Sequence, residues 1–307
     1  MSAETLGDVD GVGDVTEQRL NAAGISSIGD LADADPETIA ENANGISASK
    51  AAKLVGRANE KTITIQTGSE VRDEYQGRAC LTTGMEEFDK MLGDGWRGGD
   101  LIGISGGSDS GKTQLCFQSM VHAAEQTGDP AVYIETEPDR YSPDRLELLA
   151  NEEGTQDQIH RVPVHFDLDD QKHAYHTVRK EYDDISIVVV DSLTANIRLD
   201  EEYDGRGTLS KRSTEIGAHI RGLYQLAKEH DCPILMPLQV YGNPSGFGGG
   251  DVTYGGELLS HMLMCRVQMR EAEGAMKRAR LAGHSGLEEK EVFVRIGNQQ
   301  LEAFNDL

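Results

Sequence analysis

The sequence predicts an α/β fold with a mainly parallel central sheet, preceded by a small all-α domain. The sheet is predicted by short apolar runs that alternate with helical segments, which is the pattern of α/β domains. A glycine-rich pattern directly follows the first of these runs and leads into a helix. The all-α part is predicted by two similar glycine-containing segments near the start of the chain. We expect the two parts at 81–307 and 1–60, joined by a linker at 61–80.

Composition excludes several classes of protein. No apolar run approaches the roughly 18 residues of a membrane span, and the acidic start MSAETLGDVD is unlike a signal peptide. The four cysteines are too far apart for a zinc knuckle or an evident disulfide framework. We therefore expect a soluble, cytoplasmic protein without a membrane partner.

The net charge of −24 is spread along the whole chain of 307 residues. In molar salt the Debye length falls to about 3 Å, and dense surface carboxylates keep a protein hydrated. We interpret the acid excess as adaptation to high salt; a protein that binds basic partners is the alternative. Under the first interpretation the net charge does not exclude nucleic-acid binding, although it opposes such binding at ordinary ionic strength.

The first 60 residues contain an internal repeat. DGVGDVTEQRLNAAGI begins at Asp10 and NGISASKAAKLVGRAN at Asn44, and each is predicted to be a hairpin that leads into an amphipathic helix. Such hairpins could hold duplex phosphates at helix N-termini, but this unit has four basic residues against eleven acidic ones. Docking to a protein therefore stays open beside contact with DNA. Helical spacing predicts one buried face made of Val9, Val12, Leu20, Ile25, Ile46, Ala51 and Leu54.

Residues 61–80 are expected to be a short β-like piece followed by a polar linker. In the core, apolar runs without alternation predict strands that are buried on both faces. These runs are Leu101–Ile104, Ala131–Ile134, Ile187–Val190 and Pro233–Leu238, with Met264–Met269 and Val292–Ile296 as later strands. The glycine-rich stretch Gly242–Gly256 is predicted to be a loop.

The segment GGSDSGKT matches the pattern G-x-x-x-x-G-K-[ST] and follows the strand LIGIS. In this pattern backbone N–H groups face a nucleoside triphosphate at the start of a helix. We expect Lys112 to reach the β- and γ-phosphates of ATP and Thr113 to bind Mg²⁺. The expected nucleotide-binding residues here are Gly106, Gly107, Ser108, Asp109, Ser110, Gly111, Lys112, Thr113 and Gln114, with the helix beginning at Gln114.

Carboxylates end two further predicted strands. Asp191 follows the run ISIVVV, a usual place for a metal-facing carboxylate in nucleotide hydrolases, although a turn cap is the plain alternative. Glu135 and Glu137 end the segment AVYIETE. One of them could orient the water that attacks the γ-phosphate, and the spacing does not choose between them.

Together these segments resemble the RecA/RadA recombinase superfamily, and the archaeal RadA proteins in particular. LTTGMEEFDKMLGDGW is similar to the opening of the family's RecA-like P-loop ATPase core, and AVYIETEPDRYSPDRLELL to its strand with D-T-E and R-P-E-R. DSLTANIRLDEEYDGRGTLSKR resembles the magnesium strand and first DNA-binding loop, and YGGELLSHMLMCRVQMR the strand after the second DNA-binding loop. The first 60 residues resemble the family's helix-hairpin-helix domain. The resemblance covers nearly the whole chain.

The resemblance implies roles residue by residue. It makes Glu137, not Glu135, the water-orienting carboxylate that acts with Lys112 in catalysis. Arg145 matches an arginine that stacks on adenine, and Gln239 matches a glutamine that senses the γ-phosphate. Arg206, in DGRG, matches a DNA-contacting arginine of the first loop.

Each of these three roles has a plain alternative. Arg145 could pair with Asp144 or Glu147 on an exposed helix. Gln239 could satisfy a buried strand end, and Arg206 could pair with Asp204 in a tight turn.

Further residues are candidates for DNA contact. Phe247 and Tyr254 in the glycine-rich loop could stack on bases, or could instead anchor the loop on the sheet. Lys277, Arg278 and Arg280 form the densest basic cluster of the sequence and are expected to contact phosphate. The expected partner is single-stranded DNA, with duplex DNA as a further candidate.

Some positions depart from the family pattern. Ile65 and Gly68 stand where the family has the F-x-x-A motif by which one subunit holds its neighbour, and the linker 61–80 is the subunit-docking segment on this reading. Gly283 and Ser285 stand where the family places an Asp and a Pro over a neighbour's ATP, and Leu238 replaces an Asn. These departures suggest a divergent paralogue that associates weakly with itself, as a filament or ring, or works with a principal RadA.

The predicted function is a DNA-dependent ATPase of homologous recombination and DNA repair that performs or assists strand exchange. One alternative is a regulatory RecA-fold ATPase of the circadian-clock, KaiC-like group; another is a non-filamentous recombination mediator. The hairpin domain and DGRGTLSKR favour the recombinase.

Overall fold

A computed structural model of the chain describes residues 5–62, 65–203, 206–241, 252–253 and 255–305. The chain separates into two compact units, Met1–Gln76 and Gly77–Leu307. The domain boundaries expected from the sequence, with the all-α domain at 1–60, the linker at 61–80 and the core at 81–307, stay a prediction. In the described part of the chain, no helix combines the length and apolar character that a membrane crossing requires.

The N-terminal unit is a small helical bundle around its own core. The seven side chains predicted to be buried are all buried, which confirms their burial. They do not form one helical face, because Leu20, Ala51 and Leu54 lie on helices, whereas the other four lie in the turns before or after helices. The elements are a 3₁₀ turn, η1 (Leu6–Asp8), and helices α1 (Asp14–Ala22), α2 (Ile28–Asp33), α3 (Pro36–Asn42) and α4 (Ala48–Thr62).

The two repeats of this unit hold each other at their hairpin turns. Gly11 and Gly45 occupy equivalent turn positions, with φ of +90° and +82°, a backbone region that favours glycine. Arg57 Nη1 donates to the carbonyl oxygen of Asp10 at 2.7 Å, and Arg19 Nη1 donates to the carbonyl of Gly45 at 3.2 Å. Each arginine therefore comes from one repeat and satisfies a turn carbonyl of the other.

The β-like piece expected within 61–80 is wrong for the described residues. Helix α4 continues to Thr62, and a further helix, α5, spans Gly68–Gly77. Thr67 and Glu70 explain this start: the Glu70 N–H donates to Thr67 Oγ1 at 3.3 Å, and the Thr67 N–H donates to Glu70 Oε2 at 2.6 Å. This is a capping box, which favours a helix over a strand.

The core unit is built on one large sheet. Its strands follow the order β12-β11-β10-β9-β3-β7-β6-β4-β5. The strands from β9 to β5 pair in parallel, and β10, β11 and β12 continue the sheet at one end in antiparallel pairing. β8 pairs with β7 antiparallel, and β1 and β2 form a separate pair. All six predicted strand regions correspond to strands, although Pro233 and Met264 lie one residue before β7 and β9. The strands are β1 (Cys80–Leu81), β2 (Trp96–Arg97), β3 (Leu101–Gly106), β4 (Ala131–Glu135), β5 (Ile159–Pro163), β6 (Ile187–Asp191), β7 (Ile234–Tyr241), β8 (Val252–Thr253), β9 (Cys265–Glu271), β10 (Met276–His284), β11 (Glu291–Ile296) and β12 (Leu301–Phe304).

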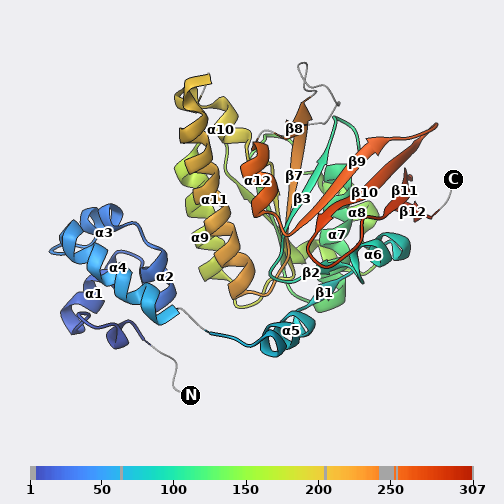
Figure 1. The fold of residues 1–307 in the computed structure, drawn as a ribbon. Coiled ribbons are helices and arrows are strands. Elements are labelled where there is room, and N and C mark those ends of the chain that lie inside the picture. The colour runs from blue at the N-terminus through green and yellow to red at the C-terminus, as the bar shows by residue number, and fades with distance from the viewer. Residues whose placement is uncertain (1–4, 63–64, 204–205, 242–251, 254, 306–307) are drawn as a thin grey trace. The chain divides into compact units, whose positions relative to one another are not determined.

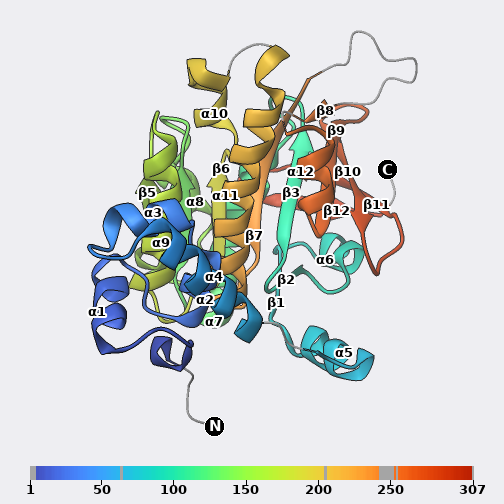
Figure 2. The ribbon, with the colours of Figure 1, turned by 60° about the vertical axis from the view of Figure 1, so that its left-hand side comes forward.

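Helices cover both faces of this sheet, as Figures 1 and 2 show, with α9 and α11 on one face and α7 on the other. Strand alternation creates the two cores: Val132 and Ile134 pack toward α9 and α11, whereas Ala131 and Tyr133 pack toward α7. The α/β architecture predicted from the sequence is confirmed. The helices are α6 (Glu86–Leu92), α7 (Lys112–Thr127), α8 (Pro143–Leu149), α9 (Leu168–Glu181), α10 (Ala195–Leu199), α11 (Leu209–Glu229) and α12 (Gly256–Met262), with 3₁₀ turns η2 (Thr155–Gln158), η3 (Glu201–Tyr203) and η4 (Arg206–Thr208).

The parallel strands end at a common edge. Gly106 of β3 lies opposite Gln239 of β7, and Glu135 of β4 lies opposite Asp191 of β6. In open α/β sheets ligands bind outside the carboxyl ends of the strands. This edge is therefore where a ligand site is expected.

Candidate functional site

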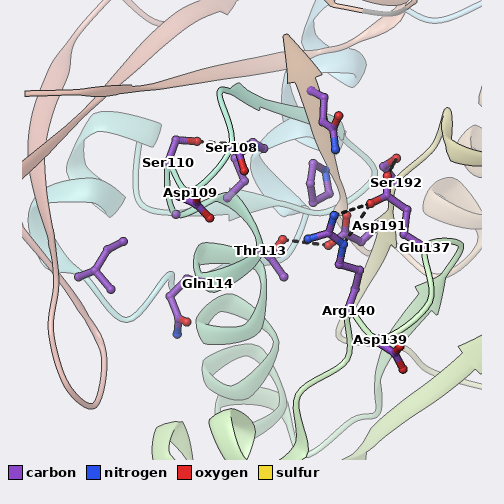
Figure 3. Close-up of a pocket in the computed structure, with 15 residues that line it drawn as sticks. Ser108, Asp109, Ser110, Thr113, Gln114, Glu137, Asp139, Arg140, Asp191 and Ser192 are labelled. Carbon is purple, nitrogen blue, oxygen red and sulfur yellow. Dashed lines mark hydrogen bonds and ion pairs between the residues drawn. The ribbon is translucent and has the colours of Figure 1, made fainter.

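A pocket of about 400 Å³ lies at this edge of the sheet. Figure 3 shows Ser108, Asp109 and Ser110 of the glycine-rich loop facing a group formed by Asp191, Ser192, Glu137 and Arg140. The pocket brings together five segments of the chain: 108–114, 137–140, 191–192, 237–239 and 296. Its lining residues are Ser108, Asp109, Ser110, Gly111, Lys112, Thr113, Gln114, Glu137, Asp139, Arg140, Asp191, Ser192, Pro237, Gln239 and Ile296.

The loop between β3 and α7 has the backbone that its glycines predict. Gly111 precedes α7 with φ of +95°, so the helix begins at Lys112, two residues earlier than expected. Gly106 lies so close to its surroundings that a Cβ there would come within 2.5 Å of the Met269 carbonyl oxygen. Gly106 and Gly107 do not line the pocket.

Lys112 is held within this loop. Its Nζ donates to the carbonyl oxygens of Gly106 and Gly107 at 2.9 and 2.5 Å. Burial lowers the pKa of its ammonium, and the nearby Asp191 carboxylate acts in the opposite direction. The Lys112 ammonium is therefore held by the loop backbone at the lining of the pocket.

Asp191 forms the polar end of β6 and is only 5% exposed. Its Oδ2 accepts hydrogen bonds from Thr113 Oγ1 at 3.0 Å and from Tyr133 Oη at 2.9 Å. Burial raises the pKa of Asp191, and these two hydrogen bonds lower it in part. The Thr113 hydroxyl and the Asp191 carboxylate are oxygen donors of the kind Mg²⁺ prefers.

These two residues suit an ion whose other ligands come from elsewhere. Within the described ranges no group of three or more His, Cys, Asp and Glu side chains could hold a metal by itself. Mg²⁺ is usually bound by one or two protein groups together with waters and substrate phosphates. The donor set at Asp191 and Thr113 fits that mode.

The two glutamates after β4 differ completely in their surroundings. Glu135 is fully buried and accepts hydrogen bonds from the backbone N–H groups of Arg140 and Tyr141, both at 2.9 Å, and from Arg161 Nε at 2.8 Å. Burial pushes the pKa of Glu135 upward, but these hydrogen bonds outweigh it and lower the pKa. Glu135 therefore braces the turn after β4, while Glu137 lines the pocket.

Glu137 is bound by side chains from two other segments. Ser192 Oγ donates to its Oε1 at 3.2 Å, and Arg198 Nη2 donates to the same oxygen at 2.6 Å. Arg140 Nε donates to Oε2 at 3.1 Å. Arg198 also donates through Nη1 to Gln239 Oε1 at 2.9 Å, so the glutamine expected near the γ-phosphate shares a partner with Glu137.

Comparison with known proteins shows the family of the chain. A family model described as Rad51 matches residues 60–304. The chain belongs to the Rad51 family. A model described as a SAM-like helix-hairpin-helix tandem matches residues 3–60, the part in which the sequence showed its repeat.

Two curated relatives of this Rad51-family chain are both called "DNA repair and recombination protein RadA". The protein of Metallosphaera sedula is 29% identical over 316 residues, covering 96% of this chain and 94% of the relative. The protein of Methanoculleus marisnigri is 30% identical over 316 residues, covering 95% of this chain and 96% of the relative. The family membership favours the recombinase interpretation over the clock-protein alternative.

In this Rad51-family core, Arg145 lies outside the pocket lining. Its Nη1 donates to the carbonyl oxygen of Asn298 at 2.7 Å, beside the turn that follows β11, rather than to Asp144 or Glu147. Its Nε and Nη2 are buried without a hydrogen-bond partner in the described part of the chain. Burial lowers the pKa of the guanidinium.

The basic cluster expected to contact phosphate does not form one patch. Strand alternation along β10 places Arg278 and Arg280 on one face and Lys277 on the other. Each has an acidic neighbour: Lys277 contacts Glu271 of β9, Arg280 contacts Glu289 just before β11, and Arg278 lies 3.9 Å from Glu291 of β11.

The remaining DNA-contact candidates are only partly covered by the structure. The backbone of Arg206 begins η4, but its side chain lies outside the described residues. Phe247 and Tyr254 lie outside the described residues altogether.

Several residues of the site could not be identified from the sequence pattern. Tyr133 and Arg198 reach Asp191 and Glu137 from 58 and 61 residues away in the chain. Arg140 and Ser192 lie close in sequence to Glu137 and Asp191, and that proximity is the one signal that could have found them.

Proposed function

We propose that this chain is a DNA-dependent ATPase of homologous recombination and DNA repair that acts in the cytoplasm, with ATP and Mg²⁺ as its cofactors. The observation that carries the proposal is the convergence of Lys112, Thr113, Asp191, Glu137 and Gln239 on one pocket at the carboxyl edge of the sheet. Phosphoryl transfer needs mainly positioning and neutralisation of charge, and this set supplies both.

Each side chain has a distinct task in this proposal. The loop backbone and Lys112 bind the phosphates, with Lys112 leaving the loop carbonyls for the β- and γ-oxygens. Thr113 and Asp191 would hold Mg²⁺, which would neutralise the negative charge of the phosphates. Glu137 orients the attacking water, and Gln239, which shares Arg198 with Glu137, senses the γ-phosphate.

We assign DNA contact to the loops that follow α10 and β7, through Arg206 and Phe247, and to Lys277, Arg278 and Arg280. The names of the RadA relatives, which concern DNA repair and recombination, support this assignment. The helix-hairpin-helix tandem is a second candidate surface for duplex DNA or for a protein. Because the basic residues of β10 are paired with glutamates, bulk charge does not drive binding.

We further infer a divergent paralogue that forms weak filaments or rings, or assists a principal RadA as a mediator. Ile65 is 97% exposed, as an anchor for another subunit would be, but it is smaller than the family's Phe. The mediator alternative rests on this weaker anchor and on Gly68, Gly283 and Ser285.

The test is ATP hydrolysis by the full chain with and without single-stranded DNA, across a KCl series up to molar concentration. We expect turnover that DNA stimulates, and loss of turnover in Lys112→Ala with the fold retained by circular dichroism. Wild-type turnover in Lys112→Ala would move the active site away from this pocket. Turnover that DNA leaves unchanged at every KCl concentration would remove DNA dependence from the proposal.

A further inference from the structure

Side chains from three positions already occupy most of the acceptor capacity of the Glu137 carboxylate. A carboxylate offers about four lone-pair sites, two on each oxygen. Oε1 receives Ser192 Oγ at 3.2 Å and Arg198 Nη2 at 2.6 Å. Oε2 accepts a hydrogen bond from Arg140 Nε at 3.1 Å, and Arg140 Nη2 lies 2.9 Å from the same oxygen as an ion pair. Hydrogen bonds therefore fill three of the about four acceptor positions of Glu137, and each carboxylate oxygen also has a cationic partner.

Release of one of these donors would leave Glu137 freer to accept a hydrogen bond from the attacking water. Ser192 is the neighbour of Asp191 in the chain, and Arg140 belongs to the same turn as Glu137, so both move with the site. Arg198 comes from α10 and makes the shortest of the four contacts. Release of Arg198 would therefore remove the shortest hydrogen bond, and one positive charge, from the Glu137 carboxylate.

Arg198 is also tied to the other end of the reaction centre. Its guanidinium forms a fork, with Nη2 on Glu137 and Nη1 on Gln239. Any displacement of the Gln239 amide pulls on the same group that occupies Glu137. Gln239 lies near the end of β7, and Arg198 lies near the end of α10, so the bridge joins the two segments that lead into residues 204–205 and 242–251.

A neighbouring cavity gives Arg198 room to move. It has a volume of about 680 Å³ and is lined by Arg198 and Leu199 on one side and by Glu137, Asp139 and Arg140 on the other. Because Glu137 lines this cavity as well as the nucleotide pocket, the guanidinium can swing off the carboxylate without repacking the core.

We propose that Arg198 is a positioning residue that holds Glu137 out of catalysis until a change at Gln239 or α10 releases it. This inference rests on the proposed ATPase function. It assigns the low-activity state to a bridge between two side chains of the site, and DNA or the γ-phosphate acts by breaking that bridge.

The experiment compares full-length wild type with Arg198→Ala and Arg198→Lys, with and without single-stranded DNA. Arg221→Ala, an exposed arginine of α11, is the matched control for the loss of one positive charge. Initial rates over an ATP series give kcat and KM, a fluorescent ATP analogue gives nucleotide affinity, and circular dichroism checks the fold.

We expect Arg198→Ala to raise kcat without DNA by about tenfold, which corresponds to about 1.4 kcal/mol of barrier. KM for ATP and analogue affinity should stay within about twofold, since Arg198 does not line the nucleotide pocket. The ratio of DNA-stimulated to basal kcat should shrink by the same factor. Arg198→Lys should fall between, because an ammonium lacks the planar fork that spans two acceptors. Arg221→Ala should match wild type.

A basal kcat that is unchanged or lower in the folded Arg198 variants would overturn the inference and make Arg198 a support of the active carboxylate. If Arg198→Ala does not fold, Arg198→Lys decides by the same criterion. Absence of turnover in wild type and in both variants, under all conditions, would instead refute the ATPase function itself, and the inference with it.

Discussion

The hydroxyl of Tyr133 offers a sharp test of the metal side of the site. Tyr133 is fully buried in β4, with its ring centroid 5.3 Å from that of Phe117 and 5.6 Å from that of Tyr141. Its Oη donates to Asp191 Oδ2 at 2.9 Å. Tyr133→Phe keeps the ring in place and removes one of the two side-chain donors that favour the ionised form of Asp191.

The expected magnitude follows from that hydrogen bond. A hydrogen bond to a charged group contributes about 1.5–3 kcal/mol, and loss of an outer-shell partner of a metal ligand typically costs about 10–100-fold in metal affinity. We therefore expect the Mg²⁺ concentration for half-maximal ATPase to rise about 10-fold or more. Burial already raises the pKa of Asp191, and loss of the Tyr133 hydrogen bond raises it further. Since Mg²⁺ binds the ionised carboxylate, the defect should be larger at pH 6 than at pH 8.

The assay is ATP hydrolysis over a Mg²⁺ titration at pH 6, 7 and 8. Tyr141→Phe is the matched control, because it removes a hydroxyl from the same aromatic cluster without touching Asp191. A half-saturating Mg²⁺ concentration in Tyr133→Phe equal to that of wild type at all three pH values would refute the assignment of Asp191 as a magnesium ligand oriented by Tyr133.

Three further changes test other parts of the molecule. Glu137→Gln should slow hydrolysis and leave the thermal midpoint near that of wild type. Glu135→Gln should instead destabilise the fold by roughly 1–3 kcal/mol, because Glu135 is a buried acceptor for Arg161 and two backbone N–H groups. The reverse pattern would exchange the roles of the two glutamates. The contact with His219 and the ion pair with Lys172 lower the pKa of Glu215 from 4.5 to about 2. Ionised Glu215 therefore stabilises the fold by at most about 3 kcal/mol, and this contribution is complete above pH 4.5 and lost as pH falls toward 2. Denaturant melts of Glu215→Gln should accordingly show a flatter acid limb than wild type, and parallel curves would contradict that pKa. Ile65→Phe with Gly68→Ala should lengthen assemblies seen by light scattering in ATP and high salt, since each added buried methylene contributes about 0.8 kcal/mol; long wild-type filaments with ATP alone would remove the weak-interface proposal.

The sheet and the loop after β3 could be predicted because their determinants are local. A run such as Ile187–Val190 is apolar at every position, and helices on both faces of the sheet bury both sides of it. In the loop Gly106–Thr113 the glycines indicate the backbone conformation, and Lys112 indicates the positive charge. Asp191 was found because a carboxylate after such a run must lie at the common edge of the parallel strands.

The contacts that tune the site could not be found in the same way. Arg198 lies 61 residues from Glu137 and 41 residues from Gln239, and only the tertiary fold brings the three together. The prediction of a β-like piece within 61–80 is wrong for the described residues for a different reason. Its β-branched TITI run suggested a strand, but the capping box of Thr67 and Glu70 lies just beyond it and starts a helix.

Gly283 shows how a departure from the family pattern can depend on a second residue. It lies opposite Arg266 at an irregularity in the pairing of β10 with β9, and a Cβ at position 283 would come within 2.4 Å of Arg266 Nη2. The guanidinium, which also donates to the Ala282 carbonyl oxygen at 3.4 Å, thus fills the space that a side chain at 283 would take. A carboxylate introduced there would first have to displace Arg266 and would then pair with it, because the two would share one small space on the strand. Restoring an acidic group at 283 alone would therefore not present a free carboxylate to a neighbouring subunit, and the glycine and Arg266 must be exchanged together to rebuild such a contact.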